Sequence, residues 1–352
     1  MTDKRRSITR RRTLGLIGGA LAAPAYIRDL HAAEVTLRLS HMLPPVAPMH
    51  AQVLEPWAKE IGEKSEGRID VQIFPAMQLG GKPPQLADQV RDGIADIAWT
   101  LVVYTPGRFP LSETGSLPFM VTNAENTSVA LHKFMEEMGM DEYKGVKPLA
   151  FHAHAPGKFH MREKAIEKAA DMKGLKIRAP NETFGKALEI LGAEPVFFPV
   201  TEMAVGLANG VIDGTLLPYE VVPVYKLQEL TSVHCAAAPV GRGFYTNTFN
   251  VLMNERVYEG LPDDLRAVVD EHSGVEFARR IGANFDTFEE VGRKLCEEQG
   301  NTFVEVPGEE VESWREMVQP VVDDWIAMLN DKGIDGARAV ERLNALIDAE
   351  SA

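Results

Sequence analysis

The stretch from Asp171 to Pro218 constrains the fold most, because short apolar segments alternate there with helix caps and chain breakers. Residues 176–179 are predicted to form a strand that ends at Pro180, since proline has no N–H for the hydrogen-bond ladder. Asn181 is then expected to cap a helix that ends at Gly192.

The same stretch continues with a second unit of this kind. We predict a strand over 196–200, a helix capped by Thr201 that ends near Gly210, and a further strand over 211–217. Open α/β sheets bind ligands at the carboxyl ends of their strands. Arg178 lies at such an end, which makes it the leading candidate for a binding residue.

An earlier part of the chain follows the same plan. Residues 68–74 are predicted to be a strand, 83–92 a helix and 93–99 a strand. Gly93 and Gly210 each follow a helix end and precede two apolar residues and an aspartate. Two α/β units built alike indicate two similar lobes with a cleft between them.

The ordered motifs of the chain resemble those of the solute-binding subunits of TRAP (tripartite ATP-independent periplasmic) transporters, the DctP-like family. They are DMKGLKIRAP, LGAEPV and NGVIDG, with GRIDVQIFPAMQLGG, YTPGRFPL and LPF before them. The resemblance covers about residues 35–330. It implies a two-lobed α/β periplasmic binding protein of the Venus-flytrap type, with a long helix that braces both lobes.

The resemblance also implies a function and partners. Such a protein is not an enzyme and needs no cofactor. It binds a small organic carboxylate in the interlobe cleft and delivers it to membrane permease subunits, and we expect a monomer. The formal net charge of −14 disfavours nucleic acid as a partner.

The lobes are expected to be discontinuous in sequence. We place lobe one at 34–154 plus 244–282, and lobe two at 155–243 plus 283–352. A long helix is predicted from about Asp263 to Gly300, followed by one or two helices over 314–347.

Residues 1–33 are predicted to be a cleavable export signal that directs the protein to the periplasm. Basic residues precede an apolar stretch from Leu14 to Ile27 that is too short to span a bilayer. The paired arginines resemble a twin-arginine signal, but Thr13 stands where phenylalanine is usual, so the Sec route is the alternative. Cleavage after Ala25 and after Ala33 both fit.

The two cysteines, Cys235 and Cys296, lie far apart in the sequence. They could pair in an oxidising compartment, but two widely spaced cysteines make no disulfide framework. We favour two buried thiols.

The family resemblance assigns the cations of the site. Arg178 matches the arginine that pairs with the ligand carboxylate through two parallel N–H bonds. Lys158 falls at a second cation position of the family, where arginine is common. A lysine supplies positive charge but not the two parallel N–H groups of a guanidinium, so the sequence does not decide whether Lys158 contacts the ligand. His41 occupies the position of a polar contact in the first strand.

Two apolar residues replace polar ones of the sialic-acid-binding branch. Leu101 stands where that branch has a glutamate, and Leu217 where it has an asparagine; Trp99, Phe198 and Tyr219 lie near them. Ligand hydroxyls facing leucine would be costly. This favours an aromatic, branched or 2-oxo monocarboxylate over a sugar acid, unless the leucines are merely core residues.

Two other functional classes remain as alternatives. A periplasmic enzyme acting on a small carboxylate is one, although the chain has none of the common nucleophile, phosphate-binding or zinc-protease motifs. A metal-binding receptor is the other, because His152 and His154 would face one side of a strand with His160 nearby. Without a convincing companion ligand we predict no metal site, although Glu202 and Glu220 could hold a cation beside the ligand.

Overall fold

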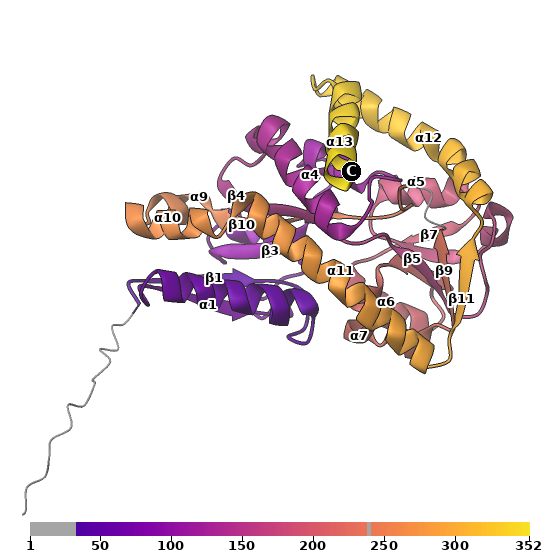
Figure 1. The fold of residues 1–352 in the computed structure, drawn as a ribbon, viewed down its shortest axis with the longest axis horizontal. Helices are drawn as coiled ribbons and strands as arrows, with labels where there is room; N and C mark the ends of the chain where they lie inside the picture. Colours follow the sequence, from indigo (N-terminus) through magenta and orange to yellow (C-terminus); the bar gives the residue numbers. More distant parts are fainter. Residues whose placement is uncertain (1–32, 238–240) are drawn as a thin grey trace, which may run out of the picture. The chain divides into compact units, whose positions relative to one another are not determined.

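The computed structural model describes residues 33–237 and 241–352, and two β-sheets organise this part of the chain (Figure 1). The predicted export signal lies outside these residues, apart from Ala33. Within the two described ranges, none of the helices combines the length and the apolar character that a bilayer span requires.

The first sheet has the strand order β2-β1-β3-β10-β4. Its strands are β1 (Val35–Ser40), β2 (Ile69–Phe74), β3 (Ile97–Leu101), β4 (Val146–Ala153) and β10 (Thr248–Asn254). Strand β1 is parallel to β2 and β3, whereas β10 is antiparallel to β3 and β4. Phe249 pairs with Leu101, so the start of β10 lies beside the carboxyl end of β3.

The second sheet has the strand order β11-β9-β5-β8-β6-β7. Its strands are β5 (Lys158–Met161), β6 (Lys176–Ala179), β7 (Glu194–Phe197), β8 (Gly214–Leu217), β9 (Val233–Ala237) and β11 (Thr302–Val306). Strand β6 is parallel to both β7 and β8, with Arg178 opposite Thr215. The carboxyl ends of β6 and β8 therefore share one edge of the sheet.

Helices pack on both sheets (Figure 1). The α-helices are α1 (Glu55–Lys64), α2 (Leu86–Arg91), α3 (Pro110–Glu113), α4 (Ala124–Met138), α5 (Glu182–Ile190), α6 (Val200–Ala208), α7 (Val222–Tyr225), α8 (Leu227–Leu230), α9 (Glu255–Glu259), α10 (Asp263–Glu271), α11 (Gly274–Glu298), α12 (Gly308–Asp331) and α13 (Gly336–Ser351). Two 3-10 helices bear on the site, η3 (Val102–Tyr104) and η7 (Tyr219–Val221).

Several predicted elements are confirmed at the residue level. Strand β6 covers residues 176–179, and the side chain of Asn181 caps α5 by accepting a hydrogen bond from the backbone N–H of Phe184 at 2.7 Å. Gly93 and Gly210 have φ angles of 77° and 68°, so both occupy the left-handed conformation that ends a helix. The repeated pattern of the sequence therefore marks two equivalent turns.

Other predicted boundaries were wrong near prolines and turns. Thr201 is not a cap, because α6 begins at Val200 after Pro199. Strand β7 ends at Phe197, before Pro199 can interrupt its ladder. The strands predicted over 93–99 and 211–217 begin later, at Ile97 and Gly214, because the residues after each glycine complete the turn.

The helix predicted from 263 to 300 is two helices, α10 and α11. Gly274 has a φ angle of 78°, which a continuous right-handed helix cannot contain. The terminal region likewise forms two helices, α12 and α13, and Gly333 with a φ angle of 79° lies between them.

Helix α11 runs past both sheets and contacts elements of each (Figure 1). Gly282 lies against the backbone of α4, where an added Cβ would sit 2.5 Å from the carbonyl oxygen of Ala124. Gly292 lies against η7, where a Cβ would sit 1.8 Å from the carbonyl oxygen of Tyr219. Two glycines thus allow one helix to approach a backbone segment beside each sheet, as expected for the bracing helix.

The C-terminal helix α13 packs against α4. Arg342 of α13 forms an ion pair with Glu137 at 2.7 Å, and Lys133 of α4 forms one with Glu350 at 2.5 Å. The end of the chain therefore lies against an element of the segment 34–154.

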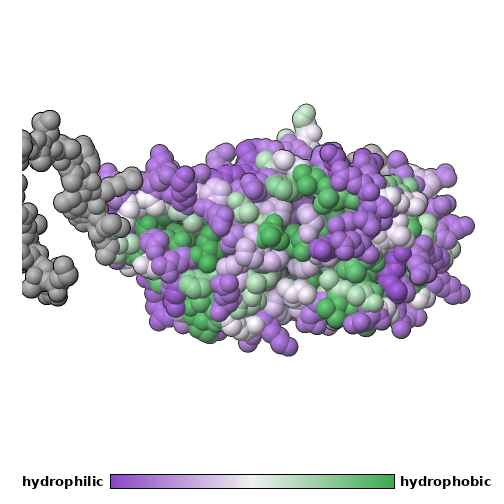
Figure 2. Space-filling view, turned by 90° about the horizontal axis from the view of Figure 1, so that it is seen from below, coloured by the Kyte–Doolittle hydropathy of each residue, from purple (hydrophilic) through white to green (hydrophobic). Residues whose placement is uncertain are grey.

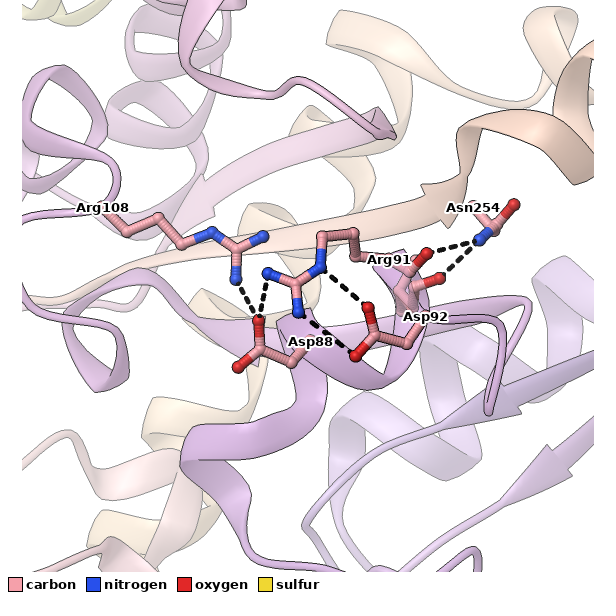
Figure 3. Close-up of polar contacts among 6 residues, drawn as sticks. Asp88, Arg91, Asp92, Arg108 and Asn254 are labelled. Carbon is pink, nitrogen blue, oxygen red and sulfur yellow. Dashed lines mark hydrogen bonds and ion pairs between the residues drawn. The ribbon is translucent and has the colours of Figure 1, made fainter.

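A polar network fixes the segment that follows β3 (Figure 3). Arg108 contacts Asp88 at 2.7 Å, and Arg91 contacts the same carboxylate at 2.9 Å. The buried amide of Asn254, at the end of β10, donates to the carbonyl oxygens of Val90 and Arg91. These contacts tie the loop after η3 to α2, and α2 to the end of β10.

Cys235 and Cys296 are both buried and free, which confirms the prediction of unpaired thiols.

On the face shown in Figure 2, hydrophobic residues occupy several separate areas among hydrophilic ones. Scattered surface apolar residues of this kind are ordinary for folded proteins. The site is instead internal.

Candidate functional site

Arg178 is a fully buried cation at the carboxyl end of β6, with a relative exposure of 1%. Its Nε donates to the carbonyl oxygen of Phe198 at 3.0 Å, which fixes the side chain. Its Nη2 has no hydrogen-bond partner among the described residues. A buried guanidinium with a free N–H group can donate to the carboxylate of a ligand at little cost in reorganisation.

The free side of Arg178 belongs to a small internal cavity between the two sheets. Its volume is about 40 Å³. The lining residues are Met42, Leu43, Trp99, Leu101, His154, Arg178, Val200, Leu217, Pro218, Glu220, Val221, Asn247 and Phe249. A cavity that binds benzene measures about 150 Å³, so the two sheets must move apart to admit an aromatic ring at this position.

Aromatic rings form one flat wall of the cavity. Trp99 of β3 stacks on Phe249 of β10 with ring centroids 5.1 Å apart and an interplanar angle of 5°. His152 stacks on Phe249 with ring centroids 4.9 Å apart, and it lies edge to edge with Trp99, whose Nε1 donates a hydrogen bond to His152 Nε2 at 2.8 Å. This bond fixes the indole plane, so the wall is preorganised for a planar ligand.

Leu101 and Leu217 close the apolar part of the cavity from opposite sheets. Leu101 is the last residue of β3, and Leu217 is the last residue of β8. Both lie at carboxyl ends of strands, as the sequence pattern requires of ligand-facing positions. Neither offers a hydrogen bond, so a ligand group placed between them should be apolar.

Three further polar side chains line the cavity. His154, Asn247 and Glu220 are all buried. Burial raises the pKa of Glu220 to about 8, and the neighbouring Glu289 adds to the rise. Glu220 is therefore mainly protonated at neutral pH, and Arg178 is the charged group that lines this cavity at that pH.

Four of the predicted binding residues line the cavity: Arg178, Trp99, Leu101 and Leu217. Phe198 is outside it but supplies the carbonyl oxygen that holds Arg178. Tyr219 faces away, with its ring against His160 and Phe303.

Lys158 also lies outside the cavity. Its ammonium group forms an ion pair with Glu289 of α11 and lies 5.0 Å from the ring centroid of Tyr219. Glu289 in turn accepts a hydrogen bond from the backbone N–H of Glu220 at 3.0 Å. The lysine charge therefore serves the contact between β5, η7 and α11.

His41 is buried behind the cavity, and both its ring nitrogens are occupied. Nδ1 accepts from the backbone N–H of Leu43 at 3.2 Å, and Nε2 lies 2.8 Å from Nδ1 of His50. His50 contacts the exposed carboxylate of Glu55 at 3.1 Å. The imidazole of His41 does not line the cavity. It holds the backbone of Leu43, which does.

Sequence reasoning missed the contribution of β10 and the segment before it. Asn247 and Phe249 line the cavity because β10 inserts between β3 and β4, far from both in the sequence. The apolar residues of Thr248–Asn254, with the β-branched Thr248 and Val251, were the available signal for this strand. Sequence reasoning also did not single out Val200 and Val221 as cavity residues, although Val200 ends one predicted strand and Val221 lies four residues after the end of another.

The histidines do not form a metal centre in the described ranges. No three side chains of His, Cys, Asp or Glu come together there in a way that could hold a metal ion. His152 and His154 do face the same side, since both contact the ring of Phe249. His160 instead pairs with His234, with the two Nδ1 atoms 2.8 Å apart.

One hydrogen bond joins the two sides of the cavity directly. The hydroxyl of Tyr104, in η3 after β3, accepts a hydrogen bond from the backbone N–H of Val200 at 2.9 Å. Val200 is the first residue of α6, whose N–H has no partner within the helix. The Tyr104 side chain, which follows a strand of the first sheet, therefore caps α6, the helix that follows β7 of the second sheet.

Comparison with known proteins gives a consistent result. The family model "Bacterial extracellular solute-binding protein, family 7" (DctP) matches residues 39–328. A TRAP solute-binding protein from a marine metagenome, specific for aromatic acid ligands and solved with 3-hydroxybenzoate, is 43% identical with a TM-score of 0.88; the match covers 91% of this chain and 100% of that one.

Two further solved structures are similar. A TRAP solute-binding protein from Rhodoferax ferrireducens T118 in complex with copurified benzoate is 40% identical, with a TM-score of 0.87 and coverage of 90% of this chain and 98% of that one. A TRAP periplasmic solute-binding protein from Bordetella bronchiseptica with bound mandelate is 30% identical, with a TM-score of 0.82 and coverage of 89% and 99%.

Proposed function

This chain belongs to the DctP family of bacterial extracellular solute-binding proteins, the solute-binding proteins of TRAP transporters, and we propose that it captures an aromatic monocarboxylate. The observation that carries the proposal is the unpaired, buried Nη2 of Arg178 in a cavity with an aromatic wall. The ligand carboxylate pairs with Arg178, and its ring lies against Trp99 and Phe249.

The rest of the cavity supports this ligand class. Leu101 and Leu217 offer no partner to the hydroxyls of a sugar acid, and each unpaired buried hydroxyl would cost about 1–3 kcal/mol. Glu220, neutral at pH 7, does not repel the carboxylate. A dicarboxylate finds no second charged partner among the residues that line the cavity.

The ligands of the three solved relatives described above point the same way. Benzoate, 3-hydroxybenzoate and mandelate each combine one carboxylate with one aromatic ring. We propose that this chain is exported to the periplasm, closes around such an acid and delivers it to TRAP permease subunits. Closure follows because a ligand that contacts both sheets binds the closed state better.

A thermal-shift screen of the purified protein tests the proposal. The set should contain benzoate, phenylacetate and mandelate, with succinate, pyruvate and glucuronate as controls. An aromatic acid should raise the melting temperature most, since a ligand stabilises by RT ln(1 + [L]/Kd). A larger response to succinate or glucuronate than to every aromatic acid would overturn the assignment.

A further inference from the structure

Two buried acceptor atoms share the cavity with Arg178. His154 Nε2 and Asn247 Oδ1 have no hydrogen-bond partner among the described residues, and both side chains line the cavity. Both side chains are almost fully buried. An unpaired buried acceptor costs free energy unless a ligand or a water donates to it. The cavity thus offers one free donor, Arg178 Nη2, for a carboxylate, and two free acceptors for a ligand group that bears a hydrogen-bonding proton.

The hydrogen-bonding role of His154 follows from its surroundings. Its Nδ1 lies 2.6 Å from the carbonyl oxygen of Ala155, which can only accept, so Nδ1 carries the proton. Burial lowers the pKa of His154 to about 3, and the positive charges of Lys158 and Arg178 contribute to the decrease. The ring is therefore neutral at pH 7, and Nε2 presents a lone pair to the cavity.

Asn247 adds a second acceptor beside the first. Its Nδ2 donates to the hydroxyl of Tyr245 at 2.6 Å, which leaves Oδ1 free. Tyr245 also contacts His154, with ring centroids 5.1 Å apart. The two acceptors therefore belong to one polar corner, held by Tyr245, next to the apolar walls.

These acceptors discriminate between aromatic acids. A carboxylate bears no proton at neutral pH, so it satisfies Arg178 but cannot donate to His154 or Asn247. A plain aromatic acid leaves those atoms facing carbon. An acid that also bears a hydroxyl can donate to them, and sites built to bind a hydroxyl reject analogues that lack it.

We propose that this cavity selects hydroxylated aromatic acids over their unsubstituted parents, with His154 as the acceptor that reads the hydroxyl. The inference rests on the proposed function, because it takes the carboxylate of the ligand to be held by Arg178. The carbonyl oxygen of Ala155 keeps the proton of His154 on Nδ1, so Nε2 can only accept a hydrogen bond. This tautomer therefore favours a ligand that donates a hydroxyl proton to Nε2.

Matched ligand pairs test this on the wild-type protein, independently of any variant. Calorimetry should compare benzoate with 2-, 3- and 4-hydroxybenzoate, and phenylacetate with mandelate. At least one hydroxylated acid should bind about tenfold or more tightly than its parent. Equal affinities, within about twofold, across every pair would overturn the inference.

Substitution of the acceptor provides the second measurement. In His154→Phe, the preferred hydroxylated acid should lose about tenfold or more in affinity while its parent changes by less than about threefold. Leu101→Ala is the matched control, because it shortens an apolar wall and should weaken both acids by a similar factor. A His154→Phe variant that keeps the full preference would refute the role of His154.

The failure of this inference is distinguishable from that of the proposed function. If no aromatic acid binds the wild-type protein, the proposed function is wrong. If parent and hydroxylated acids bind equally well and both depend on Arg178, only the selection for a hydroxyl is wrong.

Discussion

The hydrogen bond from Val200 to Tyr104 should set how readily the protein closes. Tyr104→Phe removes the hydroxyl and leaves the ring in place. In the closed state the backbone N–H of Val200 then stays buried without its partner at 2.9 Å. When the sheets separate, the same N–H reaches water, so the loss affects the closed state alone.

The size of the effect follows from that difference. Leaving a buried donor unsatisfied costs about 1–3 kcal/mol. If ligand binding requires closure, affinity should fall about five- to 150-fold, with the fold of each half intact.

Calorimetry with benzoate or 3-hydroxybenzoate measures the effect directly. Tyr258→Phe is the matched control, because its hydroxyl contacts Asp270 at 2.7 Å on the exposed surface, away from the cavity. That control should bind like the wild type. An affinity of Tyr104→Phe within about twofold of wild type would show that this hydrogen bond does not govern closure.

Two further predictions concern the cavity charge and the bracing helix. Because the pKa of Glu220 is raised to about 8, a rise in pH should ionise its carboxyl group beside the bound anion. Ligand affinity should therefore fall between about pH 7 and pH 9. In calorimetric titrations, Glu220→Gln should remove this pH dependence. An unchanged pH profile in the variant would assign the dependence to another group. Gly292→Ala would place a Cβ 1.8 Å from the carbonyl oxygen of Tyr219 and should lower the melting temperature by roughly 2–10 °C. Gly62→Ala is the control: its Cβ would lie 3.6 Å from the carbonyl oxygen of Ile69, so it should not lower the melting temperature.

The sequence allowed the local frame of the site to be predicted because its signals are short-range. Pro180 and Asn181 mark the end of β6 and the start of α5, and this fixes Arg178 at a strand end. Leu217 is placed by the same logic, since it ends the strand predicted after Gly210. The strand predicted after Gly93 ended at residue 99, so Leu101 was assigned by the family resemblance and not by this pattern. Such patterns depend only on neighbouring residues.

The remaining parts of the site depend on contacts between distant residues. Lys158 is paired with Glu289, a residue 131 positions away on α11, and no local pattern shows that pairing. Asn247 and Phe249 reach the cavity only because β10 inserts into the first sheet. The protonation of Glu220 arises from burial between η7 and α11. These features require the three-dimensional arrangement.

The most direct test of the account is the affinity of Arg178 variants for the acid that the screen identifies. Removing one partner of a desolvated charge pair costs on the order of 2–5 kcal/mol, so Arg178→Ala should lose about thirtyfold to several thousandfold in calorimetry. Arg178→Lys should also bind poorly, since the shorter, non-planar ammonium cannot both reach the carbonyl oxygen of Phe198 and present the free N–H group that Nη2 supplies. Arg342→Ala, which removes a cation of α13 that pairs with Glu137 outside the cavity, should bind normally. Binding by a folded Arg178→Ala within about threefold of wild type would contradict the account.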